Sequence, residues 1–563
     1  MKLFIVLLTG AFMLATGTSD VFAKKKEKVQ TEAKSDTVQT ASKKRNTQYP
    51  RLFKNKRVVT KKGLITIHKI DDKLYFEFPK SLLGRDLLMG SSISATSDNT
   101  SGLVGQTMTT PLHIRFAIQE DQVYMQNVTP VSRMDVYSNQ SDISKAVAKS
   151  NITPDMESFK IAAYNMDSTA VVFEVTKFFL ADNKRLPLFD QNSPSLEDEK
   201  YGQLELKAVL KKNLSSIRNF YVFDDNLEIN LDMSFYQSLL ANKKEVRGGN
   251  VRVKAVYSML LLPEETMAWR LGDPRLGYTF TKKQKISTEK DGTAFSYLQH
   301  KWNLLPADEE VYRRGDLVAP RKPVVFYIDN DFPEAWKKAI KEGVNWWNEA
   351  FKMAGFKEAV QTADFPANDT TFYAGNLKYS CIRYVPVNLS KTQSKVWVDP
   401  RSGEIINGTI FVGHDIAKTI ANQRFIQTAQ ADKRMRGLQL SEEILLESIR
   451  LYVAREVGHC LGLADNASAS AAFSVESLRS AAFTEQNGIA SSVMDELPYN
   501  YIAQPQDDKV QFVQNKLGAY DLYAIQMGYM LIPDTKTPEE IREKIMRWVS
   551  MKSGDPVYRY GKA

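Results

Sequence analysis

Residues 455–465 constrain this chain more than any other stretch of its sequence. They read R-E-V-G-H-C-L-G-L-A-D. In a helix, Arg455 and His459 would lie on the same face, because residues four apart are neighbours on the helix surface. Gly462 allows the sharp turn that ends such a helix, since glycine adopts positive φ without strain. The turn would bring Asp465 back towards Arg455 and His459, so the spacing predicts one site on which three side chains converge.

The same spacing occurs in a metal-binding signature, H-E-x-x-H-x-x-G-x-x-H, in which three histidines hold zinc and the glutamate activates a water molecule. Glu456 and His459 match two of its positions. Arg455 replaces the first histidine, and a guanidinium is a permanently charged donor with no lone pair for a metal. Asp465 replaces the third histidine, and a carboxylate can bind zinc. The sequence therefore keeps two candidate ligands, His459 and Asp465, where catalytic zinc sites use three.

Arg455 and Asp465 carry opposite charges at positions that converge. We expect a hydrogen-bonded ion pair between them to fill the place of the metal, with Glu456 as a candidate third member. Replacing one histidine alone would leave buried donors and acceptors unmatched, so the second replacement would compensate for the first. For Glu456 two interpretations stay open: a buried acid satisfied by Arg455, or a group with a residual catalytic role.

Residues 1–23 are expected to be a cleavable signal peptide. Lys2 precedes a short apolar run over residues 3–15, and Ala23 offers a small-residue cleavage site. This run is too short for a comfortable bilayer span, and no other stretch is apolar enough. We therefore expect an exported protein with no membrane span, in the periplasm, at the cell surface or outside the cell.

Residues 24–57 are expected to be a disordered, lysine-rich linker, since core-forming side chains are scarce there. The segment holds 12 Lys and Arg against 3 acidic residues, a net charge of +9. The whole chain, with 75 Lys and Arg and 66 Asp and Glu, is also +9, so the remainder is close to neutral. Nucleic-acid binding would need a basic folded face with interleaved aromatic side chains, and we expect no nucleic-acid partner.

Residues 58–300 are expected to form a strand-rich antiparallel β domain. Two apolar runs, residues 64–68 and 74–78, flank Asp71-Asp72, a pattern typical of a β-hairpin. We find no internal repeat and no catalytic motif here, and His68 and His113 are interpreted as structural or surface histidines in strands. Further runs separated by turn-forming residues predict strands at 113–118, 122–125, 170–175, 204–209 and 251–262.

Residues 301–563 show a different order of elements. A buried strand over 323–328 precedes an amphipathic helix that Pro333 opens and Gly355 closes. Ser441 then caps the helix that carries the 455–465 motif. The order of strand, helix, strands and second helix indicates an α+β fold. The strands between the two helices are predicted at 379–387, 395–398 and 408–412, with a turn at 399–404.

Several separate motifs in this order give the chain a family resemblance. They are F-Y-I at 326–328, G-V-N-W-W-N-E-A-F at 343–351, V-D-P-R-S-G-E-I at 398–405, the 454–470 segment, S-V-M-D at 492–495 and G-A-Y-D-L-Y-A-I at 518–525. In these motifs, residues 301–563 resemble the Met-zincin domain of exported, metzincin-like zinc-dependent metalloproteases of bacteria. Residues 58–300 resemble the domains of unknown function that precede it in that family.

The resemblance implies an α+β, metzincin-like (zincin) fold for residues 301–563. Family members usually carry histidine at positions 455 and 465 and run well past residue 563, so we expect a C-terminally shortened domain. Zinc is the cofactor of the family, and we expect it to bind weakly or not at all here. The resemblance also implies a set of site residues: Glu456 as the catalytic residue, His459 and Asp465 as metal ligands, and Gly462 and Met494 as supporting residues.

The remaining cysteines and histidines offer few replacement ligands. Cys381 and Cys460 are too few for a disulfide framework, and we expect two buried apolar side chains, with a disulfide between them left open. Cys460 would lie about 100° round the helix from His459, facing away from the metal side. Of His300 and His414, only His414, at a strand end, is a sequence-distant candidate ligand.

Three functions remain open. The first, favoured by Arg455 and Asp465, is a pseudopeptidase, an inactive member of a metallopeptidase family that binds a peptide or protein without cleaving it. The second is an active metallopeptidase whose rearranged zinc site uses His459, Asp465 and His414. The third is a structural surface protein that binds through its N-terminal β domain. Neither the partner nor the oligomeric state follows from the sequence.

Overall fold

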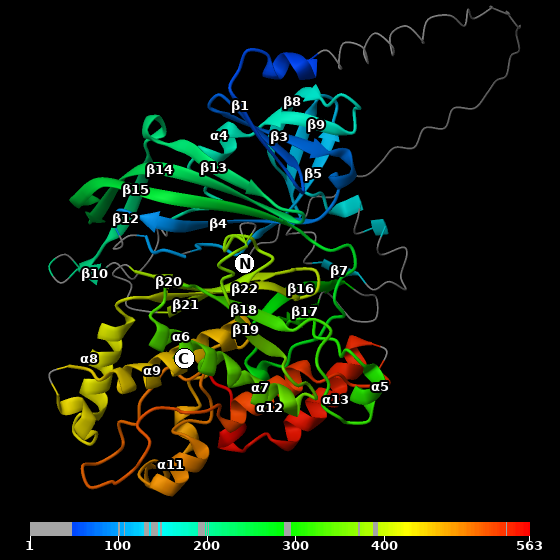
Figure 1. Cartoon of the computed structure of the whole chain (residues 1–563). Coiled ribbons are helices and arrows are strands. Elements are labelled where there is room, and N and C mark those ends of the chain that lie inside the picture. The colour runs from blue at the N-terminus through cyan, green and yellow to red at the C-terminus, as the bar shows by residue number, and fades with distance from the viewer. Residues whose placement is uncertain are drawn as a thin grey trace, which may run out of the picture.

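The computed structural model describes most of the chain after residue 47 (Figure 1). The predicted signal peptide, residues 1–23, and residues 24–47 of the predicted linker lie outside the described residues. No helix within the described ranges is long and apolar enough to cross a bilayer. The described residues are 48–98, 102–105, 107–128, 134–136, 145–146, 149–189, 197–198, 200, 202–286, 294–369, 372–386, 392–437, 439–535 and 537–562.

The described end of the predicted linker contains a short helix, residues 48–53. Tyr49, Leu52 and Phe53 pack against a small buried cluster that includes Ile70. The structure thus differs from the predicted disorder over residues 48–53, where three large apolar side chains within five residues are partly buried against the neighbouring sheet.

A 12-stranded sheet dominates the N-terminal region, and all its pairs are antiparallel. Its order is β1-β2-β3-β9-β8-β6-β5-β4-β15-β14-β12, with β13 paired to β14. In Figure 1 the long strands β4, β14 and β15 cross the middle of the molecule above the C-terminal helices. The strands are β1 (Val58–Lys62), β2 (Thr66–Ile70), β3 (Lys73–Pro79), β4 (Leu87–Thr96), β5 (Leu112–Gln119), β6 (Gln122–Asn127), β8 (Asp155–Tyr164), β9 (Ala170–Glu174), β12 (Glu205–Leu210), β13 (Ser216–Val222), β14 (Asn226–Ala241) and β15 (Lys244–Leu261).

The predicted hairpin is confirmed. Strands β2 and β3 pair with Ile70 opposite Lys73, around the turn at Asp71, whose φ is 53°. The five further strands predicted from apolar runs correspond to β5, β6, β9, β12 and β15. One face of the sheet buries a large apolar cluster that includes Phe78, Phe116 and Phe173. The apolar residues at alternate positions of the strands therefore point into this core.

Smaller elements connect this sheet to the C-terminal region. A three-stranded sheet has the order β17-β16-β7, in which β16 and β17 are antiparallel and β16 and β7 parallel. Strands β10 and β11 form a separate antiparallel pair. The bounds are β7 (Met134–Val136), β10 (Glu197–Asp198), β11 (Gly202–Gln203), β16 (Phe280–Ile286), β17 (Ala294–Gln299), α4 (Thr176–Phe179) and α5 (Glu309–Arg313).

The C-terminal region combines a five-stranded mixed sheet with most of the helices. The sheet order is β19-β18-β20-β22-β21; β21 is antiparallel to β22, and the other pairs are parallel. The strands are β18 (Val324–Ile328), β19 (Val360–Asp364), β20 (Ser380–Val385), β21 (Thr392–Val398) and β22 (Ile405–Gly413). The helices are α6 (Glu334–Asn345), α7 (Trp347–Met353), α8 (Ile416–Thr428), α9 (Glu442–Cys460), α10 (Val475–Leu478), α11 (Ala481–Asn487), α12 (Ala519–Tyr529) and α13 (Pro538–Met551).

The helix predicted between Pro333 and Gly355 is interrupted once. Helices α6 and α7 meet at Trp346, whose φ and ψ of −51° and −36° remain helical. Pro333 stands at the N-cap position of α6 and Gly355 has a φ of 88°, as their residue types predict. Helices α6 and α7 therefore form one nearly continuous helical segment with an irregularity at Trp346.

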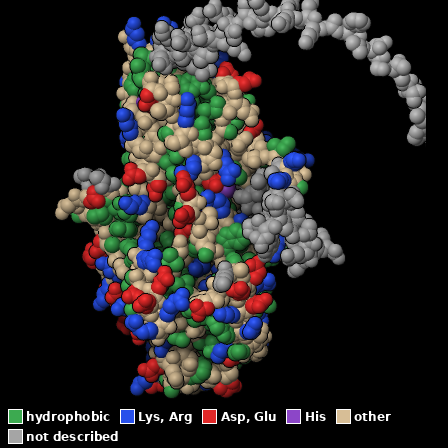
Figure 2. Space-filling view, turned by 90° about the vertical axis from the view of Figure 1, so that its right-hand side faces the viewer, with side chains coloured by type: hydrophobic (Ala, Val, Ile, Leu, Met, Phe, Trp, Pro, Cys, Tyr) green, Lys and Arg blue, Asp and Glu red, His purple; other side chains and the backbone are tan. Residues whose placement is uncertain are grey.

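A buried tryptophan and a shared arginine join the two regions. Trp397 of β21 packs in one cluster with Leu88 of β4. Arg401 Nη1 lies 3.2 Å from Asp86 Oδ2, and its Nη2 lies 2.7 Å from Asp399 Oδ2. The chain thus combines a strand-rich antiparallel N-terminal region with a helical C-terminal region. On the face in Figure 2, Lys and Arg are interspersed with Asp and Glu.

Candidate functional site

Helix α9 carries the first part of the predicted site. At its start Ser441 Oγ accepts a hydrogen bond of 3.4 Å from the N–H of Ile444. Helix α9 packs very closely on α6. A Cβ atom at Gly343 of α6 would lie 2.5 Å from the carbonyl oxygen of Arg450 of α9. This contact holds the helix that presents residues 455–459.

The turn after α9 has the geometry that the sequence predicts. Gly462 has a φ of 96°, and a Cβ atom there would overlap the carbonyl oxygen of His300. Beyond the turn, the carbonyl oxygen of Leu463 accepts a hydrogen bond of 2.9 Å from His459 Nδ1. This bond orients the histidine ring so that Nε2 faces Asp465.

Asp465 lies between two basic side chains. Arg455 Nη2 donates a hydrogen bond of 2.6 Å to Asp465 Oδ1, and His459 Nε2 lies 3.2 Å from the same oxygen. All three side chains are partly exposed, Arg455 by 24%, His459 by 23% and Asp465 by 40%. The expected ion pair between Arg455 and Asp465 is confirmed, and its third member is His459.

Both ring nitrogens of His459 face acceptors, a geometry that favours the imidazolium form. Burial lowers the pKa of His459, but the hydrogen bond to Asp465 and the negative charge of Glu456 outweigh burial, so the net shift is upward. The hydrogen bond from His459 and the charge of Arg455 hold the pKa of Asp465 below its usual value, against the effect of burial. At neutral pH Asp465 is therefore an ionised carboxylate among cations.

Glu456 has a different partner from the one expected. Its side chain is buried, and Oε1 accepts a hydrogen bond of 2.9 Å from Thr392 Oγ1 at the start of β21. Glu456 is thus a satisfied buried acid, but Thr392 satisfies it, not Arg455. Sequence reasoning missed Thr392, because no local pattern connects a threonine on that strand with helix α9.

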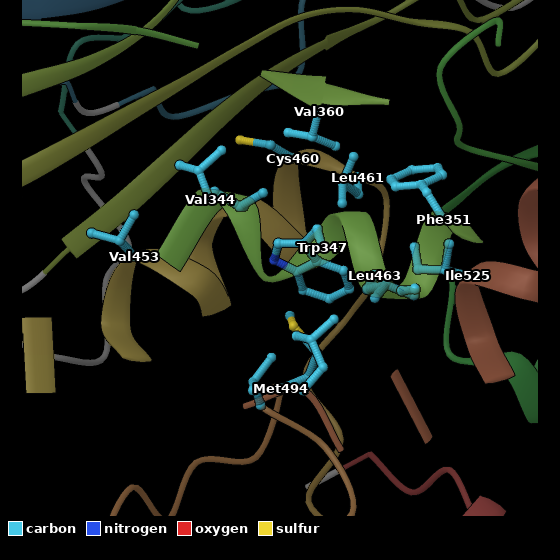
Figure 3. Close-up of a cluster of buried hydrophobic side chains, with 14 of the residues drawn as sticks. Val344, Trp347, Phe351, Val360, Val453, Cys460, Leu461, Leu463, Met494 and Ile525 are labelled. Atoms are coloured by element: carbon cyan, nitrogen blue, oxygen red, sulfur yellow. The ribbon is translucent and has the colours of Figure 1, made fainter. Parts of the chain in front are cut away.

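Met494 lies directly beneath α9 (Figure 3). It is fully buried, and a Cβ atom at Gly458 would overlap Met494 Sδ and lie 2.7 Å from Trp347 Cζ2. Trp347 Nε1 in turn donates a hydrogen bond of 2.8 Å to the carbonyl oxygen of Ala454. Met494, which the resemblance implies as a supporting residue, is thus in contact with the motif helix.

Asp521, at the start of α12, holds the segment that carries Met494. Its Oδ2 accepts hydrogen bonds of 2.8 Å from the N–H groups of Val493 and Gly518, and its Oδ1 accepts one of 2.5 Å from Ser492 Oγ. Sequence reasoning assigned Asp521 no role. The signal that could have found it is an acid three residues after a helix N-cap, which is typical of a capping box.

Asn466 anchors the last described residues to the turn that carries Asp465. Its Nδ2 donates to the carbonyl oxygen of Arg559, and its Oδ1 accepts from the N–H of Gly561, both at 3.0 Å. The N–H of Asn466 donates to the carbonyl oxygen of Met494 at 2.9 Å. One fully buried amide therefore connects three segments around the site.

A cavity of about 260 Å³ opens beside Arg455. Tyr452 and Arg455 of α9 line one side, and Asp495 and Glu496, which follow Met494, line another. Burial raises the pKa of Asp495, and its Oδ2 atom has no hydrogen-bond partner among the described residues. The cavity therefore combines a cation, two acidic groups and an aromatic ring.

The residues at positions 455, 459 and 465 do not fit a three-ligand zinc site. Arg455 has only donors, and its Nη2 atom is hydrogen bonded to Oδ1 of Asp465, one of the two candidate ligands. Of the three histidines of the signature, the sequence keeps only His459, and both of its ring nitrogens already have partners. Across the part of the chain that the structure describes, no group of three or more His, Cys, Asp and Glu side chains is arranged to hold a metal ion.

The candidate replacement ligand His414 has partners of its own. Its Nδ1 lies 2.5 Å from the hydroxyl of Tyr384, and its ring stacks on Trp336 at 6.4 Å between centroids. His300 lies between the hydroxyls of Thr279 and Thr281, at 2.9 Å from each, and burial lowers its pKa to about 4.

The two cysteines and the two histidines of the N-terminal sheet are in contact with other parts of the fold. Cys381 and Cys460 are free and buried, as expected, and a Cβ atom at Gly408 would lie 3.0 Å from Cys460 Sγ, so that thiol packs on β22. His68 Nε2 lies 2.8 Å from Glu77, and His113 Nε2 lies 2.7 Å from Asp86. Both histidines are buried in the N-terminal sheet, which agrees with their structural interpretation.

Three segments of the chain match models of known protein families. Residues 437–563 match the family model described as Met-zincin. Residues 105–307 match a domain of unknown function (DUF5117), and residues 47–96 match another domain of unknown function, DUF5118. Comparisons with curated proteins and with solved structures give no match. The predicted site residues Glu456, His459, Gly462, Asp465 and Met494 lie within 437–563, and the candidate replacement ligand His414 lies outside it.

Proposed function

We propose that this chain, whose residues 437–563 match the Met-zincin family model, is a non-catalytic member of a metallopeptidase-like family that binds a peptide or protein. In this proposal residues 301–563 form a metzincin-like domain, and α9 is the helix that in active members presents zinc ligands. Residues 58–300 form the preceding β domain. The apolar N-terminal run supports export through a signal peptide at residues 1–23.

The ion pair between Arg455 and Asp465 carries the proposal. It places a permanent positive charge 2.6 Å from the carboxylate that would have to bind a dication. A metal would have to displace Arg455 and His459 from Asp465, and it would then find two protein ligands where catalytic sites use three. In place of a metal, Asp465 is thus paired with Arg455 and His459.

The remaining site residues lack the means to activate water for peptide cleavage. When present in such a site, zinc acidifies a bound water molecule and polarises the scissile carbonyl group. Glu456 here accepts a hydrogen bond from Thr392. Without an acidified water it has no nucleophile to generate, so we expect no peptidase activity.

The cavity beside Arg455 supports retained binding. It is concave, it lies next to the former catalytic helix, and it offers both hydrogen-bond donors and acceptors from Arg455, Tyr452 and Glu496. Such a combination suits a polar peptide side chain or a turn of a protein partner. Binding there needs none of the groups that cleavage has lost.

The zinc content of the purified protein tests the proposal, measured beside the double variant Arg455→His, Asp465→His. We expect no zinc in the natural protein and one zinc per chain in the double variant, because the variant restores three imidazole ligands on an intact scaffold. A triple variant that adds Glu456→Gln is the matched control: it should bind zinc as well as the double variant does, but show no peptidase activity.

One zinc per chain in the natural protein, together with chelator-sensitive cleavage, would overturn the proposal and favour an active enzyme with a rearranged site. His414 would then be the first residue to replace, as the candidate third ligand. Absence of zinc from the double variant would also contradict the proposal, since it would mean that the scaffold no longer holds a metal-binding geometry.

A further inference from the structure

A cavity of about 930 Å³ lies along β8 in the N-terminal sheet. Figure 1 shows β8 at the opposite end of the molecule from α11, with α9 between them. Seven consecutive residues of β8, 156–162, form one wall, and α4 together with residues 181–185 forms the other. The cavity is therefore a groove that follows a strand.

The wall formed by β8 is a free strand edge over much of its length. Strand β6 pairs with residues 155–160 from one side, whereas β9 pairs with β8 only from Ile161 to Tyr164. Among the described strands, β6 and β9 are the only neighbours of β8. The other side of residues 155–160 therefore has no neighbouring strand and faces the groove.

The backbone direction on β8 can be assigned from its hydrogen bonds. The N–H of Ile161 donates a hydrogen bond of 2.9 Å to the carbonyl oxygen of Asp121, which lies in the turn directly before β6. Because backbone groups alternate in direction along a strand, the N–H and C=O groups of Ser158 point the opposite way, into the groove. These groups are of the kind that an added strand would pair with.

One side chain already uses this edge. Arg185 Nη1 donates a hydrogen bond of 3.0 Å to the carbonyl oxygen of Met156. The guanidinium thus reaches across the groove and stands in for the N–H group of a neighbouring strand. Arg185 is exposed to solvent, so an incoming backbone N–H could replace it at little cost.

Aromatic and charged side chains line the groove. Tyr75, Phe159 and Phe178 supply aromatic surface. Glu174, one of the acidic residues, is already paired with Lys73 at 2.9 Å. The lining contains four basic and three acidic residues, namely Lys160, Lys177, Lys184 and Arg185 against Glu157, Glu174 and Asp182.

We propose that this groove binds an extended, acidic peptide segment of a partner protein, which adds to β8 as a further strand. The unpaired backbone edge favours an extended chain, since main-chain hydrogen bonds supply the affinity in such complexes. Because Glu174 is paired with Lys73, four basic side chains of the lining face two other acidic ones, and this excess favours acidic residues in the partner. The Lys-rich segment 24–57 of this chain, whose residue Gln48 lies at the groove, has a net positive charge, so an acidic partner matches the basic side chains better. The proposed function concerns α9, and this site is independent of it.

A labelled peptide of about eight alternating valine and glutamate residues tests the proposal by fluorescence anisotropy with the full protein; its length follows from the seven β8 residues in the wall. We expect saturable binding, and at least about tenfold weaker binding of the same peptide with lysine in place of glutamate. Equal binding of the two peptides, or binding of neither, would overturn the proposal.

Backbone methylation separates strand addition from simple charge attraction. A peptide in which alternate amides are N-methylated, in the phase that faces β8, should lose binding, whereas methylation in the other phase should preserve it. The two phases are therefore synthesised as a pair. Equal binding in both phases would show that β8 gains no added strand, and this outcome would contradict the proposal.

Charge variants of the protein locate the binding. Two residues of the groove lining are replaced, Lys160→Glu and Lys177→Glu. Each substitution should weaken binding of the valine–glutamate peptide about fivefold, as expected for about 1 kcal/mol at an exposed charge. Lys207→Glu on β12 is the matched control, because Lys207 is exposed and lies outside the groove lining. Equal losses in all three variants would place the peptide elsewhere.

Discussion

Gly458 of α9 is in direct contact with Met494, and the position has no room for a side chain. A Cβ atom there would overlap Met494 Sδ and lie 2.7 Å from Trp347 Cζ2. Both neighbours are fully buried. The segment around Met494 can therefore approach the helix immediately next to His459, and this approach depends on a single missing side chain.

Gly458→Ala is expected to destabilise the protein by about 1–3 kcal/mol, because the added methyl group must displace two buried side chains. Alanine is the better helix former by about 1 kcal/mol, which works against this loss but does not outweigh it. Urea denaturation measures the change. Gly249→Ala is the control, since nothing lies within 4 Å of a Cβ there, and it should change stability by less than about 0.5 kcal/mol. Equal effects of the two substitutions would contradict the role assigned to the contact.

A double-mutant cycle on Arg455→Met and Asp465→Asn should give a coupling energy of about 0.5–1 kcal/mol. The value is modest because both side chains are partly exposed, and it should fall as salt is added. The comparison pair is Glu349 and Lys352, which are 2.7 Å apart on an exposed helix face and should couple more weakly. A coupling of zero between Arg455 and Asp465 would argue against the charge network.

The contribution of His459 to stability should depend on pH. Its pKa in the folded protein is raised, chiefly by Asp465 and Glu456 against burial. Its stabilising effect is therefore complete below about pH 6.5, the usual value for an unfolded histidine, and is lost as the pH rises through the folded-state pKa. The difference in unfolding free energy between the natural protein and His459→Gln should be larger at pH 6 than at pH 9. In an Asp465→Asn background this pH dependence should shrink, and an unchanged dependence would contradict the assignment.

Asp521→Ala should cost about 3 kcal/mol, since it leaves two buried backbone N–H groups and one hydroxyl without their acceptor. Asp521→Asn keeps one carbonyl oxygen for the two N–H groups and should cost less than half as much. Thermal unfolding of both variants separates the hydrogen bonds from the charge. If the asparagine variant is as unstable as the alanine variant, the carboxylate charge matters more than its acceptor geometry.

The local part of the site could be predicted from residue spacing. Helical periodicity places Arg455 and His459 on one face, and Gly462 allows the turn that returns Asp465 to them. The ion pair between Arg455 and Asp465 followed from their charges and was confirmed by the structure. These relations lie within eleven residues, where backbone geometry leaves few alternatives.

Partners from distant segments could not be predicted in the same way. Thr392 satisfies Glu456 because strand β21 packs along α9, and Asn466 binds the carbonyl of Arg559 because the end of the chain returns to the turn. A threonine or an asparagine carries no sequence signal that names its partner. The helix at 48–53 was missed for a related reason, since its three apolar side chains gain a core only from strands that follow them.

By itself, the sequence determined the resemblance to Met-zincin proteins, the position of the motif helix, the hairpin at Asp71 and the presence of arginine and aspartate at positions 455 and 465, where the zinc signature has histidine. All of these depend on residue identity and on spacing over short distances. Only the tertiary structure decided that His459 joins the Arg455–Asp465 pair, that Met494 lies against Gly458, and that β8 has an open edge beside a groove. The physical reason is that secondary structure follows local periodicity, whereas a buried polar group or a strand edge takes whichever partner the packing of the whole chain brings within hydrogen-bond distance.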